Sequence, residues 1–447
     1  MTWTARYRDH FKANLKLAFP IMTGQLGQVL VNMTDNLMVG RLGADALAAV
    51  SIANAIFIVF LVLGMGISFA LPPLVSEADG AKSYALISKY FKHSLILNIA
   101  FAFLCAGAIT LFIPLLYYLG QDPSVVPLAI PYLEITAWSL IPLMIFQTIR
   151  CYSDGMSDTL RPMYAIIIGN VINIILNYGL IYGNLGMPEM GVSGAAMASL
   201  LARIVMILLL TYFLWQKSRL WVHLVRAQYR HYQKKIFKKL LFLGVPTSMQ
   251  GFFEVTAFSG AALIMGMVGK EQQAAHQIAI NLASITFLMC SGIGMAATIR
   301  VGNQLGKRSF QSMREAGLSS ILLVAIIMGV MAILFVIFRS FLPTLYINDP
   351  TVIAYASTLL ILAAIFQIPD GVQVTALGAL RGIQDVKIPM IITFISYWIC
   401  GIPVSYVCAL ILGLEHIGVW IGLIIGLSIS ALLLTTRFYK RSTHIIN

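Results

Sequence analysis

Four carboxylic acids of this 447-residue chain lie inside long apolar segments: Asp35, Glu134, Glu254 and Asp370. A charged group at membrane depth costs roughly 2.5–3.5 kcal/mol on insertion scales, so each of these acids calls for a physical reason. A carboxyl group removed from water can take up a proton on one side of a membrane and lose it on the other. Alternatively, it can stay ionised and hold Na⁺ or an organic cation. Either use would make such an acid a site of ion coupling.

Six side-chain amides are candidates to line a cavity with the first of these acids: Gln25, Gln28, Asn32, Asn170, Asn173 and Asn177. The last three recur at spacings of three and four, which places their amides on one face of a helix. Their carbonyl oxygens could complete a cation site with Asp35. The alternatives are that the amides hold one helix against another, and that Asp35 lies at the outer interface of the membrane.

The second half of the chain offers two further acids. Glu254 lies near the middle of its apolar segment, where an interfacial position does not explain it. Asp370 lies between Pro369 and Gly371, and a Pro–Asp–Gly break within a span frees backbone carbonyls that can line a cavity. The alternative for Asp370 is a helix kink with a capping carboxylate.

Glu134 and Arg203 both lie toward the outer ends of their apolar segments. Opposite charges inside a membrane tend to pair with each other. These two residues are therefore predicted to form a structural salt bridge rather than a transport site.

The composition indicates which elements must position these residues. Residues of the set AVILMFWYC make up 59% of the chain and DEKR only 11%, whereas soluble domains run near 45–50% apolar and about 25% charged. Most of the chain must therefore lie in lipid, which excludes soluble enzymes, disordered proteins and nucleic-acid binders. The five cysteines show no CxxC spacing, so neither a disulfide framework nor a zinc site is indicated.

The apolar runs are long and continuous, which predicts an all-α polytopic membrane protein. About 20 apolar residues cross the hydrocarbon core as a helix. Twelve transmembrane helices are expected, near 15–39, 46–71, 86–114, 125–149, 161–183, 191–215, 236–267, 272–298, 316–346, 351–379, 387–412 and 417–438.

The basic residues predict the orientation of these helices. Twelve spans place both termini on one side, and that side holds 26 of the 30 Lys and Arg residues. This asymmetry predicts a multi-pass membrane protein with both termini in the cytoplasm. It also explains the net charge of +13 by topology and contact with anionic lipid, without nucleic acid.

An internal repeat divides the chain. At a shift of 226 residues Pro20 falls on Pro246 and Gly66 on Gly292, and at a shift of 227 Asp158 falls on Asp385. The repeat predicts two pseudo-symmetric six-helix bundles of equal orientation, as in secondary transporters. The expected division is an N-lobe at 1–215, a basic cytoplasmic linker at 216–235, and a C-lobe with a short tail at 236–447.

Several sequence runs resemble one transporter family. In the first half, Pro20 precedes the run DNLMVGRLGADALAA, which begins at Asp35. The second half contains FFEV at 252–255, AHQI at 275–278 and DGVQVTALGALRG from Asp370. Together these runs resemble the signatures of multidrug and toxic compound extrusion (MATE) transporters of the NorM-type bacterial branch, over essentially the whole chain.

The resemblance implies a multi-pass antiporter of the bacterial cytoplasmic (inner) membrane. It would export lipophilic organic cations in exchange for Na⁺ or H⁺ by alternating access. The resemblance implies coupling carboxylates at Asp35, Glu254 and Asp370. Lipophilic cationic small molecules and membrane lipids are the expected partners of a monomer without resident cofactor. The chain contains no GxxxxGK[ST] run, so a nucleotide is not expected to drive it.

The resemblance also implies an N-lobe cation site formed by Asp35, Asn173, Asn177 and Ser199. Many members carry Asp at the position of Asn177 and Thr at that of Ser199, so the site in this chain has one charge fewer. Na⁺ is a candidate ligand there, with Asp35, Asn173 and Asn177, or alternatively at Glu254 and Asp370.

Two other functions are compatible with parts of this pattern. A flippase for lipid-linked or amphiphilic substrates would share the superfamily and the topology. An intramembrane lipid-modifying enzyme would need clustered catalytic groups, such as a Ser/His or His/Asp set at one depth. The sequence shows no such set, so no enzymatic activity is expected.

Overall fold

The computed structural model describes residues 3–118, 122–225 and 232–446, and these residues form helices and short connections without any strand. The predicted class, an all-α polytopic membrane protein, is confirmed. Residues 226–231 of the predicted linker lie outside the described residues. The α-helices are α1 (Trp3–Gly40), α2 (Ala44–Ser68), α3 (Leu71–Gly80), α4 (Tyr84–Phe112), α5 (Val126–Trp138), α6 (Leu140–Gly155), α7 (Leu160–Tyr182), α8 (Gly191–Trp215), α9 (Ser218–Val225), α10 (Lys234–Val268), α11 (Lys270–Gly306), α12 (Phe310–Phe338), α13 (Pro350–Gly382), α14 (Lys387–Phe394), α15 (Ile402–Tyr406) and α16 (Glu415–Ile446).

Four short segments of other helical type complete the described chain. Two are 3-10 helices, η1 (Ile113–Tyr118) and η2 (Leu342–Leu345). The other two are π-helical, η3 (Ile395–Gly401) and η4 (Val407–Ile411), and they lie on either side of α15. A π-helical stretch changes the direction in which its side chains point, and such stretches are frequent at functional sites.

Eleven helical segments of the described chain are long and apolar enough to cross a membrane. Some of these are composite, since Ala44–Gly80 contains α2 and α3, and Lys387–Ile411 runs from α14 to η4. The helix α1 has the length, with 38 residues, but it is more polar than the others and is not among the eleven. With α1, the helices match the twelve predicted spans.

The side chains on α12 show how such a helix meets its surroundings. Ile326, Val330, Ile333 and Ile337 are all exposed and recur every three or four residues, so they form one apolar stripe along the helix. A stripe of this kind would be unfavourable in water and is stabilised by lipid. The sequence therefore forms helices that are apolar on the outside as well as within.

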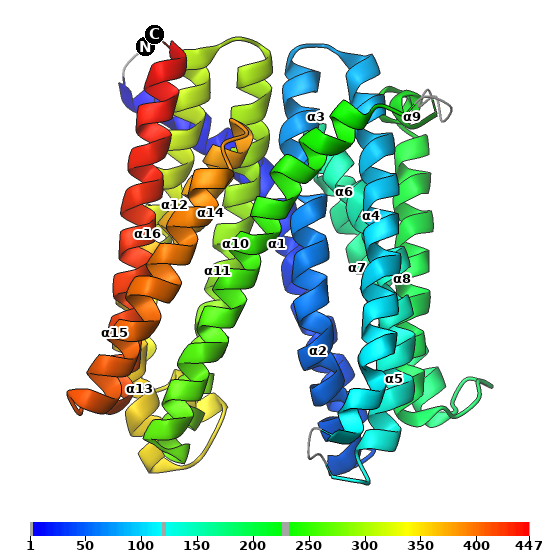
Figure 1. Ribbon diagram of the computed structural model, residues 1–447, viewed down its shortest axis with the longest axis vertical. Helices are drawn as coiled ribbons and strands as arrows, with labels where there is room; N and C mark the ends of the chain where they lie inside the picture. Colours follow the sequence, from blue (N-terminus) through cyan, green and yellow to red (C-terminus); the bar gives the residue numbers. More distant parts are fainter. Residues whose placement is uncertain (1–2, 119–121, 226–231, 447) are drawn as a thin grey trace. The chain divides into compact units, whose positions relative to one another are not determined.

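The helices assemble into two compact units (Figure 1). The first unit comprises residues 23–248, and the second comprises residues 1–22 together with 249–447. Helices α1 and α10 each begin in one unit and continue in the other. The change falls after Met22 in α1 and after Ser248 in α10, which are equivalent positions at the shift of 226 residues. The predicted division at residues 216–235 stays a prediction.

The connections between helices repeat as the sequence does. Lys82 and Arg308 follow equivalent helices and both adopt a left-handed backbone, with φ of 55° and 58°. Ser157 and Gln384 form a second equivalent pair, each with φ of 62°. Residues other than glycine adopt this conformation only where the chain requires it. The two halves therefore turn in the same way at the same places.

Equivalent aspartates also bind basic side chains at these turns. Asp158 pairs with Arg161 and lies 3.5 Å from the Nζ of Lys217, just beyond α8. Asp385, its counterpart, lies 2.8 Å from the Nε of Arg437 and 3.4 Å from the Nε of Arg441, both on α16. In each unit, an acid beyond one helix thus pairs with a base near or just beyond the end of a later helix.

Close backbone packing fixes the last helices of the second unit. A Cβ atom added to Gly422 on α16 would overlap the backbone nitrogen of Ser405 on α15. The Ser405 hydroxyl donates a hydrogen bond of 2.9 Å to the carbonyl of Val419 across the same contact. Only a residue without a side chain allows the two helices to approach this closely.

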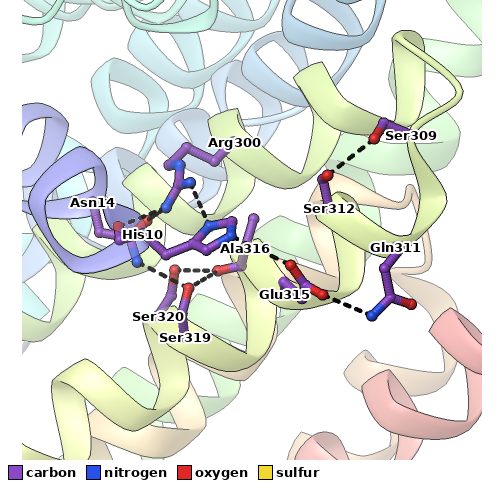
Figure 2. A network of polar contacts seen from close by, with 10 residues as sticks. All are labelled: His10, Asn14, Arg300, Ser309, Gln311, Ser312, Glu315, Ala316, Ser319 and Ser320. Carbon is purple, nitrogen blue, oxygen red and sulfur yellow. Dashed lines mark hydrogen bonds and ion pairs between the residues drawn. The ribbon is translucent and has the colours of Figure 1, made fainter. Parts of the chain in front are cut away.

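A polar network holds the start of α1 within the second unit (Figure 2). Arg300 on α11 donates hydrogen bonds to the backbone carbonyl of His10 at 2.8 Å and to the Oδ1 of Asn14 at 2.5 Å. The Asn14 amide donates in turn to the Ser319 hydroxyl on α12 at 3.5 Å. Figure 1 shows the start of α1 and the end of α16 at the same end of this unit.

Candidate functional site

In the first unit, Asp35 lies at one end of a chain of hydrogen bonds that joins three helices. The Nδ2 of Asn177 on α7 donates to the Asp35 carboxylate on α1 at 2.5 Å and to the Oδ1 of Asn173 at 3.1 Å. The Nδ2 of Asn173 donates to the Ser199 hydroxyl on α8 at 3.4 Å. We call Asp35, Asn177, Asn173 and Ser199 the Asp35 network.

Burial differs along the Asp35 network. Asp35 and Ser199 are half-buried, whereas Asn173 and Asn177 are 2% and 0% exposed. The Oδ1 of Asn177 is buried and has no hydrogen-bond partner among the described residues. An uncompensated carbonyl oxygen beside a carboxylate is a hard oxygen donor, the type of ligand that Na⁺ and other small cations accept. The network therefore has both a charge and a spare acceptor for a cation.

The remaining predicted cavity residues differ from one another in burial and in hydrogen bonding. Asn170, one turn before Asn173 on α7, is buried, and its Nδ2 has no partner in the described part of the chain. Its amide lies where α1 and α7 approach closely, since a Cβ atom on Gly27 would be 2.9 Å from the Nδ2 of Asn170. On α1, Gln25 and Gln28 are half-buried and Asn32 is exposed. Among the described residues, no hydrogen bond joins Gln28 or Asn32 to the Asp35 network.

The ion pairs of the described residues do not include the predicted salt bridge between Glu134 and Arg203. Glu134 is exposed on α5. Arg203 on α8 instead donates from Nη1 to the Ser139 hydroxyl, and its guanidinium lies 5.4 Å from the ring centroid of Phe57. Sequence alone places both residues near the outer ends of their spans, but it does not give the faces to which they point.

In the second unit, Glu254 and Asp370 belong to one electrostatic cluster. Glu254 is half-buried on α10, and Asp370 is only 4% exposed on α13. The charges of these two acids act on each other, and the charge of Arg381 acts on Glu254. The Oδ1 of Asp370 is buried without a hydrogen-bond partner in the described chain. The structure therefore brings together two acids that are 116 positions apart in the sequence.

Sequence reasoning did not identify several polar groups around this pair. Tyr397, in η3, is 1% exposed, lies within electrostatic range of both acids, and accepts a hydrogen bond of 2.9 Å from the Nε2 of Gln373. Gln367 is buried, and neither atom of its amide group has a partner among the described residues. Gln367, Asp370 and Gln373 are three residues apart, so their helical spacing could have revealed this face of α13. No spacing in the sequence indicates that Tyr397 lies near these acids.

Arg381 is the base of this cluster. Its Nη2 donates to the Oε1 of Gln250 at 2.9 Å, and the Nε2 of Gln250 donates to the carbonyl of Val386 at 3.2 Å. The Nε of Arg381 is buried without a partner in the described chain. This cluster of the second unit thus contains two acids and one base in largely buried surroundings. A cluster of this kind can attract one positive charge.

The described residues contain no group of three or more His, Cys, Asp and Glu side chains that could hold a metal ion. Transition metals select thiolate and imidazole ligands, whereas amide, hydroxyl and carboxylate oxygens suit hard cations. In both clusters the candidate ligand atoms are oxygens, including those of one or two carboxylates. Their chemistry fits a proton, a small alkali cation or an organic cation.

Comparison with known proteins adds an independent line of information. The MatE family model matches residues 20–179 and 246–407. The chain is 33% identical over 436 residues to "Probable multidrug resistance protein NorM" of Rhizobium meliloti, covering 96% of this chain and 93% of that protein. It is also 33% identical over 436 residues to "Multidrug resistance protein MdtK" of Pectobacterium atrosepticum, with 94% and 93% covered.

A similar fold occurs among solved structures. The outward-facing structure of "a multidrug resistance MATE family transporter of the MOP superfamily" matches with a TM-score of 0.88 and 24% identity, over 98% of this chain and 96% of that chain. At this identity the likeness concerns the fold alone. It agrees with the two pseudo-symmetric bundles expected from the repeat.

Proposed function

Because the chain belongs to the MatE family of membrane transporters and is not an enzyme, we propose that it is a secondary active multidrug efflux antiporter. It exports lipophilic organic cations in exchange for Na⁺ or H⁺ by alternating access. The names of the relatives support multidrug export, since they are described as multidrug resistance proteins. The expected setting is a monomer in the bacterial cytoplasmic membrane, with both termini in the cytoplasm.

The observation that carries the proposal is the buried carboxylate of Asp370. One of its oxygens has no hydrogen-bond partner among the described residues, and the carboxylate lies within electrostatic range of Glu254. A group of this kind destabilises the fold unless it binds something, because burial removes the water that would solvate it. A proton or a cation satisfies the carboxylate. Binding and release of that ion on opposite sides of the membrane is the step that couples the gradient to export.

The Asp35 network supplies a second place for a cation. Its carboxylate and the spare oxygen of Asn177 are donors for Na⁺, and protonation of Asp35 would satisfy the same charge. Both sites therefore accept either coupling ion. We propose Asp35, Glu254 and Asp370 as the coupling acids, with Asn173, Asn177 and Ser199 as neutral ligands or positioning groups.

The proposal is tested by efflux of a fluorescent cationic dye from cells that lack other exporters. Asp35→Asn, Glu254→Gln and Asp370→Asn are each expected to abolish efflux while the protein stays folded. Glu134→Gln removes an exposed acid from the same type of span and is expected to leave efflux unchanged. Full efflux in all three site variants would overturn the proposal.

Reconstitution into liposomes identifies the coupling ion and the type of substrate. An inward proton gradient and an inward Na⁺ gradient are imposed separately while uptake or release of the dye is followed. Acceleration by one gradient alone assigns the ion. Movement of a labelled lipid without any movement of the dye would instead indicate a flippase and would contradict cation export.

A further inference from the structure

Arg203 is a half-buried base that the coupling scheme does not use. It lies on α8, one helical turn after Ser199, and is therefore adjacent to the far end of the Asp35 network. A guanidinium is always charged and seldom lies within a membrane helix without a functional or structural reason. The expected ion pair with Glu134 does not supply that reason.

The guanidinium of Arg203 is fixed by neutral groups. It donates to the Ser139 hydroxyl, which itself donates to the carbonyl of Thr136 at 2.6 Å, so the hydroxyl hydrogen is already used and only its lone pairs face Arg203. The ring of Phe57 covers the guanidinium. These contacts set the position of the charge without cancelling it.

Asp35 is the acid that balances this charge within the first unit. The charges of Asp35 and Arg203 act on each other, and both act on Tyr132 of α5, which packs in the same interior. Glu134, the acid expected from the sequence to pair with Arg203, is exposed on α5. Asp35 and Arg203 together therefore supply one acid and one base, whereas the cluster around Asp370 contains two acids and one base.

The internal repeat gives Arg203 no charged counterpart in the second half of the chain. Gly191 is equivalent to Gly418, and the same shift of 227 residues places Ser430 at the position of Arg203. Ser430 is fully buried and uncharged. The extra base on α8 thus belongs to one half of the chain and is not a by-product of the repeat.

We propose that Arg203 is a fixed counter-charge that lowers the affinity of the Asp35 network for the transported cation and thereby speeds its release. The inference rests on the proposed cation transport. A carboxylate with amide oxygens in a low-dielectric interior would hold a cation tightly, yet transport requires that the ion also leaves. A fixed positive charge nearby repels the bound cation without occupying its ligands. Arg203 is accordingly a positioning residue that acts through the electric field.

The test compares Arg203→Gln with Arg203→Lys in the purified full-length protein. Tetraphenylphosphonium and Na⁺ are titrated separately at alkaline pH, where protons compete least. Arg203→Gln is expected to bind each cation about tenfold more tightly. Arg203→Lys keeps the charge and is expected to bind like the wild type. In proteoliposomes, Arg203→Gln should lower both KM and the maximal rate of tetraphenylphosphonium transport.

A double-mutant cycle measures the coupling between Arg203 and Asp35 in cation binding. In an Asp35→Asn background, Arg203→Gln is expected to change cation affinity by less than about twofold, because the charge that attracts the cation is gone. Unchanged or weaker binding in folded Arg203→Gln would overturn the inference, as would a tenfold effect that persists in Asp35→Asn. Arg203→Met, which keeps the aliphatic stem over Phe57, provides the neutral variant if Arg203→Gln does not fold.

The outcomes also separate the inference from the function on which it rests. A wild-type protein that transports tetraphenylphosphonium, with equal KM in Arg203→Gln, retains the proposed function and refutes the role of Arg203. A wild-type protein that neither binds nor transports this cation refutes both.

Discussion

Arg300 of α11 and His10 of α1 are joined twice, once through the backbone and once through the side chain. The guanidinium donates to the carbonyl of His10 at 2.8 Å and to its imidazole Nδ1 at 2.7 Å (Figure 2). Since arginine can only donate, Nδ1 must accept, and the ring proton lies on Nε2, which faces the carboxylate of Glu315 at 3.5 Å. The imidazole thus connects a base on α11 to an acid on α12.

This contact attaches the first turns of α1 to the second unit, before the helix passes into the first unit after Met22. Arg300→Met is expected to lower the stability of the protein by about 1–3 kcal/mol, because a buried network loses its central donor. The change is measured as a lower melting temperature in detergent. Lys307→Met removes an exposed base directly after the end of α11 and serves as the control. Equal melting temperatures for the two variants would contradict an anchoring role for Arg300.

Asn177 is expected to be essential as a polar residue but not as an amide. Asn177→Leu removes the donor to Asp35 and the spare oxygen, and dye efflux is expected to fall about tenfold or more. Asn177→Asp retains oxygen ligands and adds a charge, so cation binding is expected to persist and to become tighter. Efflux assays and Na⁺ titrations measure the two effects. Full efflux in Asn177→Leu would argue that the network is structural.

Asp370 is expected to reduce stability while it enables transport. Asp370→Asn replaces a buried acid, whose Oδ1 has no partner among the described residues, with a neutral group of the same shape. Transport is expected to be lost and the melting temperature to stay equal or rise, because functional groups are often unfavourable for the fold. Thermal denaturation and dye efflux are measured on the same preparations. A markedly lower melting temperature would indicate that Asp370 is a structural cap, as in the kink alternative.

Gly422 is expected to be indispensable for packing rather than for transport chemistry. Gly422→Ala places a methyl group against the backbone of Ser405 and should destabilise the protein by about 1–3 kcal/mol. Gly329→Ala on α12 is the matched control, since an added Cβ atom there meets nothing within 4 Å. The two variants are compared by melting temperature and by yield after purification. Equal behaviour would contradict the close approach of α15 and α16.

The sequence by itself determined the class of protein and much of its internal plan. An apolar fraction of 59% and continuous runs of about 20 residues require helices in lipid, since only internal hydrogen bonds satisfy the backbone there. The repeat predicted equivalent halves, and the paired left-handed turns at Lys82 and Arg308 agree with it. The family resemblance of the motif runs is confirmed by the family model. The asparagines of α7 could be placed on one face because their spacing follows the helical period.

The tertiary structure alone decided which side chains meet. It joined Asp35 to Asn177 across two helices, directed Arg203 to Ser139 instead of Glu134, and added Tyr397 to the two acids of the second unit. Helical periodicity gives the relative directions of side chains within one helix. It does not give the rotation of that helix about its axis or its neighbours, because these depend on packing between segments that are far apart in the chain. In this protein, contacts between helices determine where each charge lies and what balances it.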